Sequence, residues 1–231
     1  MARLYLVRHG ETTANVLGQL DTALPGANLT DFGARQGVRF GLTNPLHTPS
    51  LLVNSVASRA QQTAELIASA WGADPVSLDG LHEVQAGDLE GRSDREAHET
   101  FRDVVHRWHH GEIDARLPGG ESLEMLRARY LPVIDELAAA NLTGDQQRDV
   151  YVVSHGAAIR LVAAHLAGID PEFALRHHLR NTETVELELT DSGWTCLRWG
   201  GVTDFAVPDT VVPTTPDEDS TAVGPDDEPL G

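Results

Sequence analysis

Two stretches of this chain, residues 4–10 (LYLVRHG) and residues 150–156 (VYVVSHG), decide its fold. Each is a short apolar run that ends close to a histidine–glycine pair. A short apolar run that stops at a glycine turn is typical of a buried strand. Residues 50–55 (SLLVNS) and 75–78 (PVSL) add two more expected strands of the same kind.

Helical patterns separate these strands. We expect helices over residues 30–42, 59–71, 94–110, 122–140 and 156–166. Ser58 is the expected N-cap of the second helix, and residues 183–189 and 194–199 are expected to close the domain as a β-hairpin. Strands that alternate with helices predict an α/β fold, here a three-layer α/β/α sandwich around a mostly parallel central sheet.

The composition excludes several classes of function. The chain has 231 residues, with 17 Lys or Arg against 35 Asp or Glu, so its net charge is −18. This balance argues against general nucleic-acid binding and against adhesion to an anionic membrane surface. No apolar run approaches the roughly 20 residues that span a bilayer, and the N-terminal run is too short for a signal peptide. Cys196 is the single cysteine, so no disulfide can form within the chain, and we expect a cytoplasmic protein. We interpret its thiol as part of the core.

The C-terminal end differs from the rest of the chain. Residues 206–231 hold 7 acidic residues, no Lys or Arg, and 5 of the 12 prolines. Such a composition buries too little apolar surface to offset its ordering entropy. We therefore expect one domain over residues 1–205 and an acidic, proline-rich disordered tail over residues 206–231.

The two histidine–glycine pairs carry the expected chemistry. Carboxyl ends of parallel strands meet at one edge of a sheet, where ligands bind, so His9 and His155 are expected to share a pocket. The helix N-termini at that edge favour an anion. Arg8 precedes the first histidine, and Arg59 follows the strand that ends at residue 55. Arginine matches phosphate oxygens and a neutral imidazole can attack phosphorus, so the pattern indicates a phosphoryl site.

Residues 8–12 (RHGET), with Asn15 after them, resemble the signature of the histidine phosphatase superfamily, in its phosphoglycerate mutase-like branch (branch 1). Four further segments match motifs of this family in order: residues 58–64 (SRAQQTA), 81–91 (LHEVQAGDLEG), 118–122 (PGGES) and 154–156 (SHG). The resemblance covers about residues 3–200. It implies a phosphoglycerate mutase-like version of the predicted sandwich.

The resemblance also implies roles for individual residues. His9 is the expected nucleophile, which becomes phosphohistidine. Arg8, Arg59 and His155 are expected to neutralise the charge that grows on the transferring phosphoryl group. Glu83 is expected to protonate the leaving oxygen and then to activate water.

Binding contacts and cofactors follow from the same resemblance. Asn15 and the backbone of Gly156 are expected to contact the phosphate or the substrate. No metal ion or other cofactor is expected, because the arginines supply the positive charge. The expected partner is a small phosphorylated substrate, and neither nucleic acid nor a membrane. The sequence leaves open whether the chain forms a homodimer.

Two activities fit such a pocket. The first is a phosphomonoester hydrolase that acts on a small phosphorylated metabolite, and the second is a phosphoglycerate mutase. Mutases of the family carry an arginine directly after the catalytic glutamate, but Val84 follows Glu83 here, and residues 91–118 contain no adjacent arginine pair. These departures favour hydrolysis. A catalytically inactive binding module is disfavoured because no expected pocket residue is missing.

Other polar residues have simpler interpretations. Asp88 and Glu90 lie near Glu83 and compete with it for the role of the acid. Glu121 fits a helix N-terminus, where it would favour the helix dipole.

Two histidines and a set of arginines lie in the presumed lid region. His106 and His110 share one helix face, which raises the alternative of a metal site, although a solvated helix end is favoured over it. Five arginines of this region are hypothesised to contact a second anionic group of the substrate: Arg92, Arg95, Arg102, Arg107 and Arg116.

Overall fold

The computed structural model describes residues 2–44, 46, 50–203 and 205. The predicted tail, residues 206–231, lies outside the described residues, so the predicted domain boundary at residue 205 stays a prediction. Within the described residues, no helix is long and apolar enough to cross a membrane.

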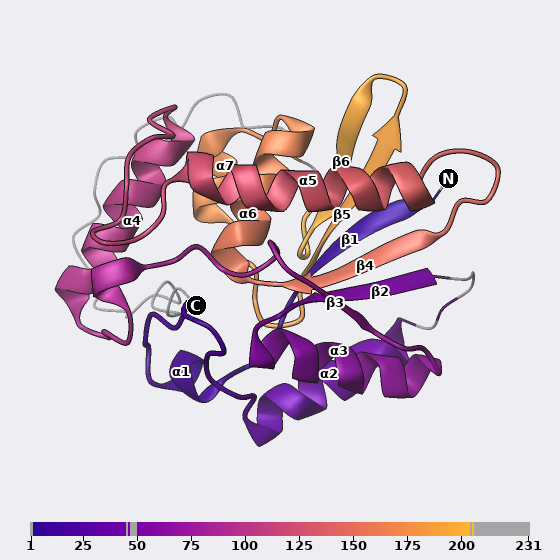
Figure 1. Ribbon diagram of the computed structural model, residues 1–231, viewed down its shortest axis with the longest axis horizontal. Helices are drawn as coiled ribbons and strands as arrows, with labels where there is room; N and C mark the ends of the chain where they lie inside the picture. Colours follow the sequence, from indigo (N-terminus) through magenta and orange to yellow (C-terminus); the bar gives the residue numbers. More distant parts are fainter. Residues whose placement is uncertain (1, 45, 47–49, 204, 206–231) are drawn as a thin grey trace, which may run out of the picture.

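A six-stranded sheet forms the centre of the molecule (Figure 1). Its strands are β1 (Arg3–Arg8), β2 (Ser50–Ser55), β3 (Val76–Leu78), β4 (Asp149–Ser154), β5 (Thr184–Thr190) and β6 (Gly193–Trp199). They follow one another across the sheet in the order β3-β2-β4-β1-β5-β6. The first four strands are mutually parallel, whereas β5 is antiparallel to β1, and β6 to β5. The predicted mostly parallel sheet and closing hairpin are confirmed.

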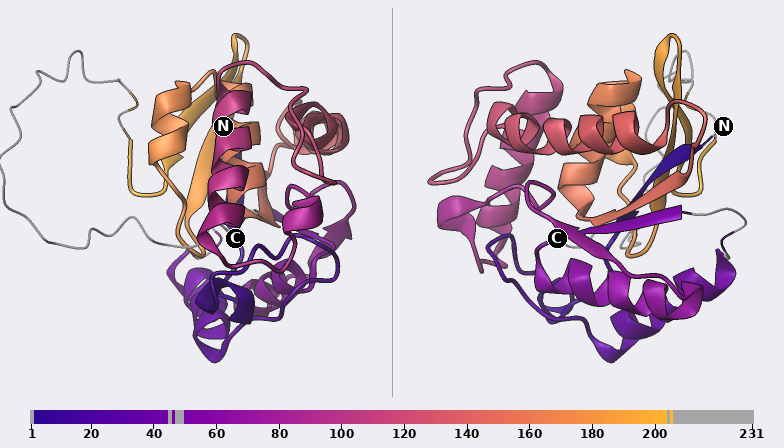
Figure 2. Two further views of the ribbon diagram at one scale, coloured as in Figure 1. Left: turned by 90° about the vertical axis from the view of Figure 1, so that its left-hand side faces the viewer. Right: turned by 45° about the vertical axis from the view of Figure 1, so that its right-hand side comes forward.

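Helices cover both faces of this sheet. They are α1 (Thr13–Val16), α2 (Asp31–Thr43), α3 (Ser58–Trp71), α4 (Arg95–His109), α5 (Leu123–Asn141), α6 (Gly156–Ala167) and α7 (Pro171–Arg176), with a 3₁₀ turn at Gly87–Leu89. Helices α2 and α3 lie on one face, and α5, α6 and α7 lie on the other (Figures 1 and 2). Helix α4 lies beside the sheet rather than on a face (Figure 1). The three-layer prediction is therefore confirmed.

Local hydrogen bonds explain where these helices begin. The side chains of Thr30 and Ser122, the residues with which the predicted ranges of α2 and α5 begin, accept bonds from the first-turn backbone as N-caps. The prediction for α3 was wrong by one residue: Ala57 is the N-cap, and Ser58 is the first helical residue. Helices α1 and α7 were not predicted from the sequence, because 4 and 6 residues are too few to show helical periodicity.

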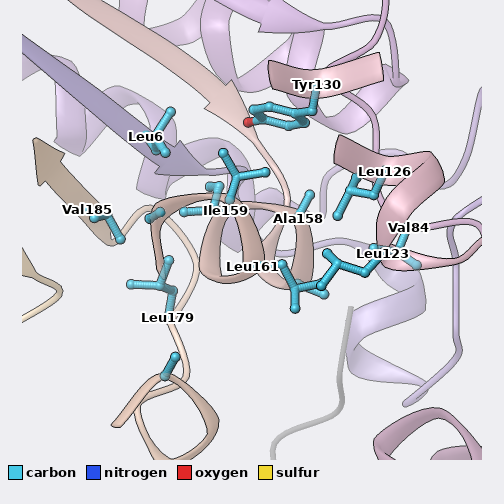
Figure 3. Packing of buried hydrophobic residues seen from close by; sticks show 14 of the residues in the cluster. Leu6, Val84, Leu123, Leu126, Tyr130, Ala158, Ile159, Leu161, Leu179 and Val185 are labelled. Carbon is cyan, nitrogen blue, oxygen red and sulfur yellow. The ribbon is translucent and has the colours of Figure 1, made fainter. Parts of the chain in front are cut away.

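Helix α6 lies at the centre of the larger hydrophobic core (Figure 3). Its residues Ala158 and Ile159 are fully buried, between Leu6 of β1 on one side and Leu126 and Tyr130 of α5 on the other (Figure 3). This packing fixes the N-terminus of α6 against the carboxyl end of the sheet, where the functional site lies. Cys196 is buried in the same core, as predicted.

Candidate active site

The two histidine–glycine pairs meet at the carboxyl end of the sheet. Arg8 pairs with Ser154 in the parallel register of β1 and β4, and the His9 amide donates to the Ser154 carbonyl at 3.0 Å. This register places the His9 and His155 rings side by side, with centroids 5.3 Å apart. Both side chains are 0% exposed. The structure thus brings together the two imidazoles that the sequence assigned to one pocket.

The surroundings of His9 define its tautomer. Its Nδ1 lies 2.7 Å from the carbonyl oxygen of Gly10, which can only accept, so Nδ1 carries the proton. The Nε2 atom then holds the lone pair and accepts a bond from Arg59 Nε at 3.1 Å. Burial, aided by the charges of Arg59 and Arg8, holds the pKa of His9 well below its usual value. His9 is therefore a neutral imidazole whose nucleophilic atom is Nε2.

His155 has the opposite arrangement. Its Nδ1 accepts from Arg59 Nε at 3.2 Å, so the proton lies on Nε2, which donates to the Ser55 hydroxyl at 2.9 Å. Burial, together with the charge of Arg59 and the neighbouring His9, holds the pKa of His155 well below its usual value. In this structure both rings present a lone pair to the same guanidinium.

Arg59 links the two histidines to a third segment of the chain. It lies in the first turn of α3 and is 2% exposed, and its Nη1 pairs with Asp21 at 3.1 Å. Burial lowers the pKa of Arg59, and the charges of Asp21 and Glu83 act against this shift. Gly26 lets the Asp21 loop close over Arg59, because its φ is +75° and a Cβ there would lie 2.3 Å from Nη1.

Arg8 reaches from β1 to the start of α6. Its Nη1 donates to the carbonyl of Leu179. A Cβ at Gly156 would lie 3.3 Å from Arg8 Nε, so the first residue of α6 lies against this guanidinium. Arg8 and Gly156, both predicted to contact the substrate, therefore lie next to each other.

Asn15 is held in place by hydrogen bonds to Thr12 and Asn181. Its side-chain oxygen accepts from the Thr12 amide in a capping box and from Asn181 Nδ2 at 3.3 Å. Asn181 also donates to the His9 carbonyl at 3.0 Å. Asn15 thus lies beside the first histidine, and Asn181 joins the two.

Glu83 lies at the N-terminus of α6 and is 2% exposed. Its Oε1 accepts from the amides of Val84 and Ala158, both at 2.8 Å, and its Oε2 accepts from the Ala157 amide at 3.0 Å. The N-cap of α6 is His155, so the helix that follows the second histidine also holds the acid. Glu90, its competitor in the sequence, instead binds the backbone of Thr22.

Arg129 fixes the loop that carries Glu83. It donates to the carbonyls of residues 80, 82 and 83 at 2.7–2.8 Å, and it pairs with both oxygens of Glu121 at 2.9 Å. Glu121 also accepts from the Gln85 amide at 2.9 Å. Glu121 precedes the N-cap of α5, near the helix N-terminus that the sequence indicated, but its carboxylate anchors the loop of the acid.

Most of the predicted lid arginines have other partners. Arg92, Arg95 and Arg107 each pair with a nearby acid on the surface, and Arg116 donates to the Gly120 carbonyl. Arg102 instead lines a cavity of about 320 Å³ between α4 and α7.

The same cavity is lined by a buried arginine, Arg160, which no sequence motif indicated. Burial lowers its pKa to about 10, and the nearby Glu83 charge opposes the shift. Its Nη1 donates to the Ala174 carbonyl at 3.2 Å.

Four further residues that sequence reasoning missed shape this site: Asp21, Ser55, Arg129 and Asn181. Ser55 had a usable signal, because it ends the β2 strand at the same edge as the two histidines. The other three act from a loop, a helix and a turn, and no short motif distinguished them.

Comparisons with known proteins agree on one family. The family model described as histidine phosphatase superfamily (branch 1) matches residues 4–201. A curated protein of Salmonella choleraesuis, named probable phosphoglycerate mutase GpmB, is 30% identical over 203 residues, which cover 86% of this chain and 90% of that protein.

Solved structures show the same likeness. A mycobacterial glucosyl-3-phosphoglycerate phosphatase with VO3 has a TM-score of 0.72 and 26% identity, covering 87% of this chain and 100% of that one. The alpha-ribazole phosphatase of Shigella flexneri has a TM-score of 0.67 and 25% identity, covering 89% and 98%.

Proposed function

Because this chain belongs to the histidine phosphatase superfamily, branch 1, we propose that it is a phosphomonoester hydrolase that acts through a phosphohistidine intermediate. One observation carries the proposal: His9 donates its Nδ1 proton to the Gly10 carbonyl and keeps the Nε2 lone pair beside Arg59. That is the protonation state that an imidazole needs to attack phosphorus.

The first half-reaction forms the phosphoenzyme. The reacting complex carries one proton on the Glu83 carboxyl group. The Nε2 lone pair of His9 bonds to phosphorus while the ester P–O bond breaks, and the leaving oxygen takes this proton from Glu83. The imidazole ring gains positive charge, which the Gly10 carbonyl at Nδ1 stabilises. Arg8, Arg59 and His155 stabilise the phosphoryl oxygens, which carry most of the charge in this transfer.

The second half-reaction releases phosphate. Glu83, now a carboxylate, takes a proton from water as the water oxygen attacks phosphorus. The N–P bond breaks and its electron pair returns to His9 Nε2, which restores the starting state. Arg129 and Glu121 serve this step as positioning residues, because they hold the loop that carries Glu83.

The local charges support this chemistry in an acidic protein. Arg8, Arg59 and Arg160 are all buried, and the charge of Glu83 acts on both Arg59 and Arg160. Ionic screening over about 8 Å separates these arginines from distant surface acids. We infer that these cations replace a metal ion in the reaction. Hydrolysis is then expected to persist in EDTA.

The alternative activity is a phosphoglycerate mutase, which the Salmonella relative favours by its name. The residue that follows Glu83 argues for hydrolysis: Val84 is 0% exposed and lies in the hydrophobic core, where the mutases of the family carry an arginine. At this position the chain therefore has a buried apolar side chain in place of the arginine that follows the catalytic glutamate in those mutases.

A panel of phosphomonoesters that includes 3-phosphoglycerate and glucosyl-3-phosphoglycerate tests the proposal. Reactions in EDTA are scored for both released phosphate and isomerised product. We expect phosphate release from at least one small metabolite ester, without isomerisation. Isomerisation of 3-phosphoglycerate without phosphate release would establish the mutase and overturn the proposal.

The remaining expectations for the whole protein are also proposals. We propose a small phosphorylated metabolite as substrate, no nucleic-acid or membrane partner, and a cytoplasmic location. Asn15 and Gly156 are proposed substrate contacts, since both lie beside the histidine and arginine of one strand end.

A further inference from the structure

Three potential metal ligands come together on the surface between α4 and α7. They are His106, in the last turn of α4, His110, its C-cap residue, and Glu172, in the first turn of α7. One ligand atom from each lies within 4.8 Å of the other two. The sequence shows the two histidines one helical turn apart, and the fold adds the carboxylate from a distant part of the chain.

The two histidines lie close enough to bind one ion once their rings turn from the stacked arrangement so that both lone pairs point to it. Their rings stack with centroids 4.1 Å apart and an interplanar angle of 22°. The Nδ1 of His110 lies 2.8 Å from the His106 carbonyl oxygen, so this nitrogen carries the proton and Nε2 holds the lone pair. Metal-bound histidines are commonly oriented by such a bond from the other ring nitrogen to a carbonyl.

The carboxylate faces the free nitrogen of this pair. Oε1 of Glu172 lies 3.6 Å from His110 Nε2, while Oε2 pairs with Arg176 at 3.2 Å. Tetrahedral zinc with bonds of about 2.0–2.2 Å needs neighbouring ligand atoms roughly 3.4 Å apart. The 3.6 Å separation is close to this value. The His110 and Glu172 side chains are 46% and 47% exposed, so they are free to rotate and bring their ligand atoms to the distance that zinc requires.

We propose that the chain binds one Zn²⁺ ion, or a neighbouring divalent transition-metal ion, through His106, His110 and Glu172, with water in the fourth position. Two imidazoles and one carboxylate suit Zn²⁺ and its transition-metal neighbours, whereas Mg²⁺ and Ca²⁺ prefer oxygen ligands. None of the three side chains takes part in the proposed hydrolysis. The ion would join α4 to α7, the helix that leads to the Leu179 and Asn181 contacts of the active site.

Calorimetric titration of the full chain with ZnCl₂, after chelator treatment and buffer exchange, tests this site. We expect one saturable zinc ion per chain. His106→Ala and His110→Ala should each raise the Kd about 10-fold or more, and Glu172→Gln should raise it by about the same factor. MgCl₂ should give no saturable binding at these residues.

A matched control separates this site from histidines in general. His165 is also an exposed histidine in the last turn of a helix, α6, but it belongs to no ligand cluster among the described residues. His165→Ala should bind zinc as the unmodified chain does. Zinc should raise the Tm of both proteins and leave unchanged the Tm of the His106→Ala/His110→Ala variant.

Several results would overturn the proposal. They are the absence of saturable zinc binding by the unmodified chain, unchanged affinity in the variant without both histidines, or saturable magnesium binding at these residues. Unchanged affinity in Glu172→Gln would show that the ion does not join the two helices. Without metal, the variants at His106, His110 and Glu172 should have the same Tm as the unmodified chain, which would show that these surface substitutions leave the fold intact.

Discussion

The two histidine–glycine strand ends are alike in sequence and lie side by side, yet they present opposite ring nitrogens to Arg59. His9 accepts there through Nε2, and His155 through Nδ1. The difference arises at the far side of each ring, where His9 meets the Gly10 carbonyl and His155 meets the Ser55 hydroxyl. A carbonyl only accepts, whereas a hydroxyl can donate or accept.

This contrast assigns different abilities to two similar residues. The carbonyl locks His9 in the tautomer of a nucleophile. The Ser55 hydroxyl lets His155 accommodate a proton on either nitrogen, so His155 can become a donor through Nδ1 when a phosphoryl anion arrives. The hydrogen-bond partner on the far side of each ring, rather than the strand-end motif, separates the nucleophile from the electrostatic partner.

Replacing the nucleophile is expected to have the largest effect. His9→Ala should lower kcat about 10⁴-fold or more, because it removes the imidazole that forms the N–P bond in the proposed mechanism. Steady-state phosphate release measures the change, and circular dichroism checks that the variant is folded. A loss below about 100-fold would show that the N–P bond is not on the main path.

The second histidine is expected to matter less. His155→Ala should lower kcat about 10²–10³-fold, because it removes one of several groups that stabilise the phosphoryl oxygens. The variant should still become phosphorylated on His9, although more slowly. Equal losses in the two alanine variants, with no phosphoenzyme in either, would contradict the separate roles.

The effect of replacing Glu83, the acid bound at the N-terminus of α6, is expected to depend on the substrate. Glu83→Gln cannot supply a proton, so phosphoryl transfer from an alkyl phosphate should slow about 10²-fold or more, and transfer from p-nitrophenyl phosphate much less. A pre-steady-state burst of p-nitrophenol measures the first step alone. Equal slowing of that step for both esters would remove Glu83 from the role of the acid.

Replacing each of the two strand-end glycines by alanine should lower the stability of the protein to a different extent. A Cβ at Gly10 would lie 2.5 Å from the Gly33 carbonyl oxygen, which belongs to the backbone of α2, whereas at Gly156 it would meet the Arg8 side chain at 3.3 Å. Gly10→Ala should therefore lower the free energy of unfolding by about 1–3 kcal/mol, and Gly156→Ala by less. Urea unfolding of both variants measures this, and the reverse order would contradict the packing described here.

A pH dependence of stability is the smallest expected effect. Both histidines are neutral in the folded protein because their pKa values are lowered, but in the unfolded chain they titrate near 6.5. Below that pH the unfolded state binds more protons, so the free energy of unfolding falls by up to about 1.4 kcal/mol per pH unit for each histidine.

Urea unfolding between pH 7.5 and 5.5 measures this slope. The decline should be shallower in His9→Asn and in His155→Asn than in the unmodified chain. The same slope in all three proteins would show that the two imidazoles are not held neutral by the fold.

Much of the fold followed from the sequence because its strands are short apolar runs with clear ends. The β1 and β4 stretches each end beside a glycine, and the parallel arrangement then requires that their histidines meet. Helices α1 and α7 were missed because capping and tertiary contacts, rather than periodicity, stabilise such short helices.

The site was predictable only where chemistry coincides with a strand end or a motif. His9, His155 and Arg59 satisfied that condition. Asp21 and Arg129 did not, because each reaches the site from a distant segment whose position depends on the completed packing. A third ligand for the lid histidines was hidden for the same reason, since α7 meets α4 only in the folded chain.

A rapid-quench experiment on Glu83→Gln with ³²P-labelled p-nitrophenyl phosphate tests the central claim most directly. This ester needs no acid to leave, and the variant lacks the base that activates water, so the phosphoenzyme should accumulate. We predict one acid-labile, base-stable phosphoryl group per chain, located on Nε2 of His9 by mass spectrometry and absent from the His9→Ala protein. A label on any other residue, or one that persists in His9→Ala, would contradict the account.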